Sequence, residues 1–464
     1  MKWLALLLSL TLLVATHELG HLLFAKLFRT RVNRYYVFFN WKFSILKAKK
    51  FGGKWHFLFF NSKTPESWEV ENLAPEDQNN TLWGLGWIPL GGYCDIAGMV
   101  DETKSADDLA AEPQPWEYRT KPAWQRLLII SGGVLVNFVS ALLIYGLIFA
   151  HWGKTELPLA NATYGYVYHE VLHEEGFCDG DIIRAIDGRE YTDAADALMA
   201  LLVDNPQSVT LMRGDSLVDI SLSGHLTERA SKRQVKNMMM PRIPFVVRDF
   251  VAGSAAQRGG MQVGDSVVAF GGQPVVFYNE VTAAIQARAG DTATIAYYRD
   301  GQLMTALLEV PTSGRIGVYP KAAEDFFDIV HRDYNFFEAI PAGVSYGWQT
   351  LVDYVSSLKM LFAPGGAQNL GGFGTMASIF PDTWDWLSFW NITALLALVL
   401  AFMNIIPIPG LDGGHILFTL WEIITRRKPS DKFLTVSQNI GMFLLLALMI
   451  LANGNDILRW LGLM

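Results

Sequence analysis

The chain has 464 residues, of which 51% are hydrophobic, and its formal net charge at pH 7 is −8. It is too long for one ordinary domain and more apolar than an average soluble protein. The negative charge, spread over the polar regions, gives no reason to expect a nucleic-acid partner.

The first predicted element is an apolar run over about residues 3–27, which is long enough to cross a membrane. It contains His17, Glu18 and His21. An ionisable side chain in a membrane helix costs about 2.5–3.5 kcal/mol, so this triplet indicates a functional site. At about 3.6 residues per turn, the two histidines lie on one face and can bind one metal ion. Glu18 lies beside them and can accept a proton from water. We assign residues 1–29 to this helix.

Residues 30–122 form the next region. Its first half alternates aromatic positions in a pattern typical of strands: Tyr35, Val37, Phe39, Trp41, Phe43, then Trp55, Phe57 and Phe59. We expect a β-hairpin or sheet that dips into the membrane beside the histidines, where its edge could hold an unwound peptide. The alternative is a small cytoplasmic sheet with an ordinary core. The acidic, Asn-rich segment from Pro65 to Asn80 is expected to be a solvated insertion.

Three further apolar runs, at about 124–151, 388–408 and 434–453, complete four predicted spans. Basic residues cluster after the first span and between the third and fourth: Lys26, Arg29, Arg31, Arg34, Lys42, Lys47, Lys49, Lys50, Arg426, Arg427, Lys428 and Lys432. The positive-inside rule places both clusters in the cytoplasm. After the second transmembrane helix (123–152), the region up to 387 is therefore expected in a periplasm or its equivalent.

An internal repeat follows the second span. The segment Gly180–Gly188 matches Gly264–Gly272, and helical patterns follow at 193–203 and 278–289. We predict two α+β domains at 153–228 and 229–320, which resemble circularly permuted bacterial PDZ domains. Such domains add an extended peptide or a protein C-terminus to a sheet edge. A rigid spacer or size filter without a ligand is the alternative.

Residues 321–387 are predicted to form a linker that includes an amphipathic helix from about Ile340 to Phe362. Its apolar stripe should lie on the membrane surface or under the domain pair.

The third span continues into a motif, and we assign 388–425 to both together. A hydrolytic zinc site needs a third protein ligand. The best candidate is Asp412, in the segment from Asn404 to His415. Pro407 and Pro409 should break the helix before it, which is tolerated at membrane depth where the backbone lines a cavity. The fourth helix and the C-terminus occupy 426–464. His415 is expected to be a packing residue and not a ligand.

Together these motifs resemble the site-2 proteases, most closely the bacterial branch typified by the regulator of sigma-E protease. The resemblance covers almost the whole sequence and includes the segments 17–21, 88–93, 131–138 and 404–415. It implies His17, His21 and Asp412 as ligands of one Zn²⁺ per chain, with Glu18 and Asn404 as catalytic residues. It also implies substrate binding by Asn137, Asn404, Pro407 and Pro409. Gly133 and Phe373 replace prolines common in the family, and we expect neither to touch the metal.

The sequence is therefore interpreted as a polytopic α-helical protein of a bacterial inner membrane, with four spans, a membrane-associated β-sheet and an inserted PDZ pair. The expected activity is hydrolysis of peptide bonds in transmembrane segments of single-pass proteins, near the cytoplasmic side. Family substrates of this type are anti-sigma factors and remnant signal peptides. Two other interpretations remain: a zinc-binding transporter or sensor without hydrolysis, and a PDZ scaffold on a membrane anchor.

Overall fold

The structure is a computed structural model that describes residues 1–89, 91–99, 112–233, 235, 237–362 and 370–461. The protein divides into two compact units. The first unit contains residues 1–153, 333–355 and 370–464, and the second contains residues 154–332 and 356–369.

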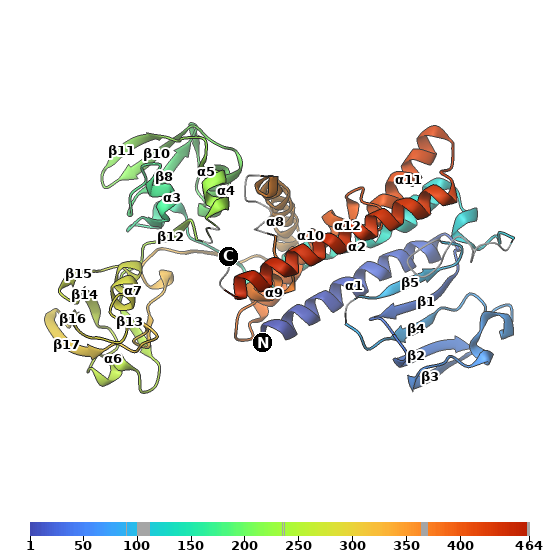
Figure 1. Cartoon of the computed structure of the whole chain (residues 1–464), viewed down its shortest axis with the longest axis horizontal. Coiled ribbons are helices and arrows are strands. Elements are labelled where there is room, and N and C mark those ends of the chain that lie inside the picture. The colour runs from blue at the N-terminus through green and yellow to red at the C-terminus, as the bar shows by residue number, and fades with distance from the viewer. Residues whose placement is uncertain (90, 100–111, 234, 236, 363–369, 462–464) are drawn as a thin grey trace. The chain divides into compact units, whose positions relative to one another are not determined.

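Four helices of the first unit are long and apolar enough to cross a membrane: α1 (Lys2–Leu27), α2 (Ala123–Trp152), α10 (Trp386–Ile405) and α12 (Asp431–Trp460) (Figure 1). Within the described residues these four helices coincide with the four predicted spans and have the length and apolar composition that a span requires. The third helix ends at Ile405, three residues before the predicted end, because Pro407 cannot continue it and restricts the residue before it.

α8 (Phe336–Ser357) is present where an amphipathic helix was predicted, but it contacts α2 through small residues. Its buried residues are Ala339, Gly343 and Gly347. A Cβ at Gly343 would lie 2.2 Å from the backbone nitrogen of Gly146 in α2, so the two backbones are in direct contact. Of the apolar residues that defined the predicted stripe, Val344, Trp348 and Val355 are exposed, whereas Leu351 packs against the core.

The described part of 30–122 contains a five-stranded sheet in the order β3-β2-β4-β1-β5, rather than a lone hairpin. The strands are β1 (Val32–Val37), β2 (Ser44–Phe51), β3 (Lys54–Asn61), β4 (Leu82–Leu85) and β5 (Tyr93–Ile96). β1 pairs parallel with β4 and antiparallel with β5. One face of the sheet packs on α1, where Tyr35 and Ile96 join a core with Leu22 and Ala25.

The segment 65–80 was expected to be a solvated insertion, and most of its residues are indeed exposed. It contains two short 3₁₀ helices, η1 (Glu66–Trp68) and η2 (Val70–Asn72). Trp68 and Leu73 are buried, and Lys49 of β2 donates to the Trp68 carbonyl over 2.7 Å. Two apolar side chains thus anchor an otherwise acidic segment on the sheet.

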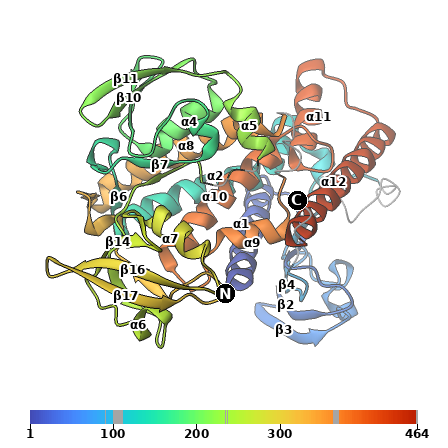
Figure 2. The ribbon, with the colours of Figure 1, turned by 60° about the vertical axis from the view of Figure 1, so that its left-hand side comes forward.

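The remaining elements of this unit are short: η4 (Tyr118–Thr120), α9 (Phe373–Ile379) and α11 (Asp412–Thr425). α9 carries Phe373 and docks on the C-terminal end of α12 (Figure 2). Asp456 of α12 accepts the backbone N–H groups of Gly372 and Thr375, each over 3.0 Å. A carboxylate from a distant helix therefore caps α9, whose own cap position is Gly372 and lacks a side chain.

The second unit contains two repeats whose described elements follow the same order, except that α5 of the first repeat has no counterpart in the second, and this confirms the internal repeat. The first repeat contains β7 (Tyr166–Tyr168), α3 (Glu170–His173), β8 (Ile182–Ile186), β9 (Arg189–Glu190), α4 (Ala194–Val203), β10 (Ser208–Arg213), β11 (Ser216–Ser221), α5 (Leu226–Lys232) and β12 (Met239–Pro241). The second contains β13 (Val247–Phe250), α6 (Ala255–Arg258), β14 (Ser266–Phe270), β15 (Gln273–Pro274), α7 (Tyr278–Gln286), β16 (Thr292–Arg299), β17 (Gln302–Glu309) and β18 (Val318–Pro320). Sheet β11-β10-β8-β9 corresponds to β17-β16-β14-β15, and pair β12-β7 to β18-β13.

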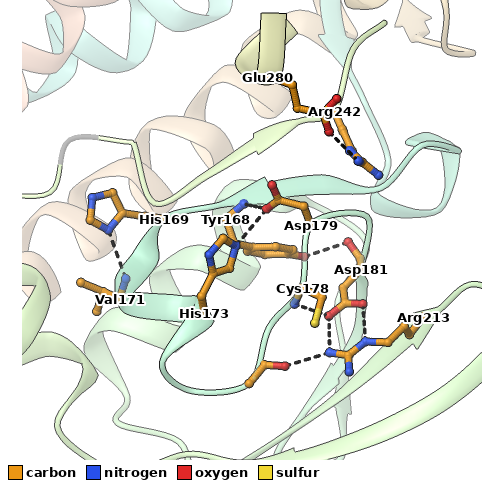
Figure 3. Close-up of polar contacts among 11 residues, drawn as sticks. Tyr168, His169, Val171, His173, Cys178, Asp179, Asp181, Arg213, Arg242 and Glu280 are labelled. Carbon is orange, nitrogen blue, oxygen red and sulfur yellow. Dashed lines mark hydrogen bonds and ion pairs between the residues drawn. The ribbon is translucent and has the colours of Figure 1, made fainter. Parts of the chain in front are cut away.

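Each repeat is organised around one buried acid. In the first, Arg213 donates to both carboxylate oxygens of Asp181 and to the Gly176 carbonyl (Figure 3). In the second, Arg299 makes the same three contacts with Asp265 and Gly260. Asp181 and Asp265 are fully buried. The equivalence extends from strand order to individual hydrogen bonds.

The two repeats meet at Arg242, which follows β12. Its guanidinium stacks on the Phe277 ring and donates to Glu280 of α7 over 2.9 Å (Figure 3). The first repeat extends to Pro241, because β12 pairs with β7. The boundary that we placed between residues 228 and 229 falls inside α5. Two short strands pair at the ends of the unit, β6 (Lys154–Glu156) and β19 (Val330–Arg332).

Three 3₁₀ helices complete the described elements: η5 (Leu159–Asn161), η6 (Ala323–Asp325) and η7 (Leu358–Phe362).

Candidate metal centre

Three side chains from α1 and α11 converge inside the first unit. His17 Nε2 lies 3.1 Å from Asp412 Oδ2, His21 Nε2 lies 3.4 Å from the same oxygen, and the two nitrogens lie 3.2 Å apart. Both histidines are buried. Within the described part of the protein, this is the group of His, Cys, Asp and Glu side chains that could hold a metal ion. The structure brings together the three residues that the sequence proposed as ligands.

Each imidazole is oriented through its other nitrogen by α2. His21 Nδ1 lies 3.0 Å from the carbonyl oxygen of Ile129, so Nδ1–H donates there and Nε2 keeps its lone pair. His17 Nδ1 lies 3.4 Å from the side-chain amide of Asn137, which also bonds Thr16 Oγ1 over 3.0 Å. As the amide stands, Thr16 Oγ1–H donates to Asn137 Oδ1 and Asn137 Nδ2 faces His17 Nδ1. A His17 Nε2 that binds a metal requires the amide to be reversed, so that Oδ1 accepts from Nδ1–H and Nδ2 donates to Thr16.

Asn137 was expected to bind substrate, but its environment favours a role in orienting His17. Its side chain is fully buried and engaged at both ends. The segment 131–138 therefore supports the histidine motif from the neighbouring helix.

Two glycines allow α2 to approach α1 this closely. A Cβ at Gly132 would lie 2.6 Å from the Gly20 carbonyl oxygen, and one at Gly133 would lie 2.6 Å from His21 Nε2 and from His17 Cε1. The expectation that Gly133 does not touch the metal stays a prediction, but the residue lies against both histidines. Its missing side chain leaves the space that the two imidazoles fill.

Asp412 is the first residue of α11 and follows a tight turn. Residues 406–411 connect α10 to α11, with Gly410 at φ 96° and a hydrogen bond from Leu411 N to the Ile408 carbonyl. Among the described residues, Asp412 Oδ2 is a buried oxygen that accepts no hydrogen bond of ordinary geometry, although His17 Nε2 lies 3.1 Å away. One carboxylate oxygen and two imidazole nitrogens whose lone pairs point to a common position are typical of metal ligands.

Glu18 lies beside this triangle and contacts the sheet. Its carboxylate accepts the backbone N–H of Cys94 in β5. Tyr35 of β1 donates its hydroxyl to the Ala15 carbonyl over 2.7 Å, and burial raises the pKa of Tyr35 to about 12, so it remains a donor. Two strands thus attach to the motif helix, and β5 is an edge strand of the sheet.

The other predicted site residues surround the turn. Asn404 is buried one residue before the end of α10, and its side chain makes no hydrogen bond within the described residues. Pro407 and Pro409 lie in the turn itself. His415 stays outside the triangle, as expected, and contacts Gln438 of α12. It lines a cavity of about 310 Å³ with Met99, Tyr118, Arg126 and Glu422.

The triangle has the dimensions of a zinc site. Ligands about 2.0–2.1 Å from a tetrahedral zinc lie about 3.3–3.4 Å from one another. The observed separations of 3.1, 3.2 and 3.4 Å fall close to that range. Two imidazole nitrogens and one carboxylate oxygen are a donor set found in catalytic zinc sites, which keep a further position open for water. The residues present therefore fit zinc.

A membrane-embedded His-Glu-x-x-His helix with a remote aspartate defines the class as a membrane metallopeptidase. The sequence profile of Peptidase family M50 matches residues 5–62 and 66–448. The chain therefore belongs to this family, the site-2 proteases. It is a zinc metalloprotease, and Zn²⁺ is its cofactor.

Curated proteins from other bacteria are similar to this chain over most of its length. The chain is 27% identical over 477 residues to "Regulator of sigma-E protease RseP" of Escherichia coli (strain K12), covering 97% of each. It is 27% identical over 490 residues to a Vibrio cholerae protein named as a zinc metalloprotease, covering 99% of this chain and 98% of the relative. A third, from Xylella fastidiosa and named in the same way, is 30% identical over 402 residues, 82% of this chain and 88% of the relative.

Proposed function

We propose that this protease hydrolyses peptide bonds within the transmembrane segments of single-pass membrane proteins, using His17, His21 and Asp412 to hold one zinc ion. The convergence of these three side chains within a bundle of membrane-length helices is the observation that carries the proposal. Anti-sigma factors and remnant signal peptides are the substrate types that the resemblance to sigma-E regulators favours.

The chemistry divides between the cofactor and the protein. When bound, zinc supplies a Lewis acid that activates water and polarises a carbonyl. The Glu18 carboxylate accepts a proton from the attacking water and later donates it to the leaving amine. The Asn404 amide makes no hydrogen bond to a described residue and would stabilise the developing oxyanion.

The substrate must be unwound before it can react, because a transmembrane helix uses its carbonyl groups in its own hydrogen bonds. We propose that the outer edge of β5, the last strand of the described sheet, takes the unwound segment as an added strand. The hydrogen bond between Glu18 and Cys94 supports this, because it places the proposed base beside that edge.

The sidedness follows from charge. The basic clusters after the first and third spans support a cytoplasmic location of the site in a bacterial inner membrane. The repeats of the second unit would then be periplasmic. We propose that they are PDZ domains that take a peptide or a protein C-terminus, or that exclude bulky ectodomains.

The test is cleavage of a tagged single-span substrate by purified wild type and Glu18→Gln, with zinc quantified in both. The variant keeps the ligands and removes the base. One zinc per chain in both, with cleavage only by wild type, is expected. A matched control is Glu71→Gln, which changes an exposed carboxylate of η2 outside the triangle.

The other outcomes discriminate between functions. Zinc in both proteins without cleavage of several substrates would favour a transporter or sensor. Unchanged cellular function of His17→Ala and Asp412→Ala would favour a scaffold. Absence of zinc from wild type would refute the three-ligand site.

A further inference from the structure

Helix α12 touches the rest of its unit at few points. Among the α12 residues whose burial the structure describes, Gly441 and Asn455 are buried. Large apolar side chains between them, such as Phe443 and Ile450, are exposed. Asn455 donates to the Leu370 carbonyl beside α9, which accounts for that end of the helix. The burial of Gly441 needs a separate explanation.

Gly441 lies directly on the turn that leads to Asp412. A Cβ at position 441 would lie 1.4 Å from the carbonyl oxygen of Pro409 and 2.2 Å from its carbon. Gly410 makes the reciprocal approach, because a Cβ there would lie 3.2 Å from the backbone nitrogen of Met442. The backbones of α12 and the turn are in contact, which only glycine permits at 441.

Gln438 lies three residues earlier, on the same face of α12. Its side-chain amide donates to His415 Nε2 over 2.9 Å. His415 follows Asp412 by about one turn of α11. One face of α12 therefore contacts the backbone or side chains on both sides of Asp412, at Pro409 before it and at His415 after it.

We propose that Gly441 and Gln438 are positioning residues that hold Asp412 in line with the two histidines. The proposal rests on the proposed role of Asp412 as a zinc ligand. The turn has little room to absorb a shift, because a Cβ at Gly413 would lie 2.0 Å from the Ile406 carbonyl oxygen. Zinc ligand distances vary by only about 0.2 Å, so displacement or loosening of this turn weakens binding.

The test compares Gly441→Ala with Gly454→Ala in the full-length protein in detergent. Gly454 lies on the same helix, and a Cβ at this position would meet no atom within 4 Å, so it is a matched control. Zinc affinity is measured by competition with a chromogenic chelator, and the ligand set by the absorption spectrum of the Co²⁺ form. We expect about 10–100-fold weaker zinc binding and an altered spectrum for Gly441→Ala, with no change for Gly454→Ala.

Gln438→Leu provides a second variant that removes the His415 contact and keeps the backbone packing. A smaller loss of zinc affinity is expected. Wild-type affinity and spectrum in Gly441→Ala would overturn the proposal. If Gly441→Ala does not accumulate as folded protein, wild-type affinity in Gln438→Leu overturns it. Absence of zinc from the wild type would instead refute the proposed function itself.

Discussion

Arg126 at the start of α2 donates to Glu422 of α11 over 2.5 Å, and both side chains are largely buried. α2 carries Gly133 and Asn137, which contact the histidines, and α11 carries Asp412. The ion pair therefore ties together the two helices that flank the metal centre, at a point outside the centre itself.

Breaking this pair should destabilise the protein more than a surface ion pair would. Arg126→Met leaves Glu422 buried without its partner, which costs about 3–5 kcal/mol in comparable buried pairs. Thermal unfolding in detergent measures the loss. The double variant Arg126→Met with Glu422→Leu should recover much of it, because both charges are gone. Equal stability of single and double variants would contradict the assigned pairing.

Asn137→Leu should weaken zinc binding by about 10–100-fold, because the amide that orients His17 is lost while the side-chain volume is nearly kept. Competition with a chelator measures the effect. Asn391→Leu is the control, since that amide donates within its own helix to Leu387. An unchanged zinc affinity in Asn137→Leu would leave substrate contact as the remaining role for this residue.

The contact between the two repeats should weaken in acid. Burial raises the pKa of Glu280, but hydrogen bonds from the Val276 and Phe277 backbone and from Arg242 outweigh it and leave the pKa below its usual 4.5. A depressed carboxyl pKa adds stability above the unfolded value that is lost as pH falls through the folded value. The difference in unfolding temperature between wild type and Glu280→Gln should therefore be constant above about pH 5 and shrink below pH 4.5. If the difference in unfolding temperature instead grew as the pH fell, the pKa of Glu280 would have to be raised on folding and not lowered.

Trp55 should lie within reach of lipid. Trp55, Phe57 and Phe59 are exposed at alternate positions of β3, so they share one face of that strand. Brominated lipids should quench the emission of Trp55, and Trp55→Phe should remove part of the quenched signal. Trp68→Phe is the control, because the Trp68 side chain is buried against the sheet. If both variants lose the same amount of quenched emission, the result would favour a sheet that does not contact the membrane.

The spans, the histidine motif and the repeat could be predicted, because each depends on a pattern within one short stretch of sequence. Hydropathy marks α1, α2, α10 and α12, and helical spacing brings His17 and His21 to one side. The two repeats share a Gly-Asp turn, and the aspartate in it is the buried acid of each repeat.

The sheet and the backbone contacts could not be predicted in the same way. β4 and β5 are four residues each and are stabilised by pairing with β1, a distant partner that short sequences do not specify. The segment 131–138 was noticed as a motif, but nothing in its letters says that Gly133 faces two imidazoles. The contact of Gly441 with the turn could not be predicted, because the sequence of an apolar helix does not show what a glycine in it contacts.

The three converging side chains also set an order of events during biosynthesis. His17 and His21 are made first, on α1, whereas Asp412 lies on α11 near the end of the sequence. A ribosome-bound polypeptide with only α1 and α2 in the bilayer still lacks Asp412, one of the three zinc ligands that we propose. With the ligand set that we propose, hydrolytic capacity arises only after α11 has been synthesised, so shorter nascent polypeptides that stop before α11 could not hold the zinc ion.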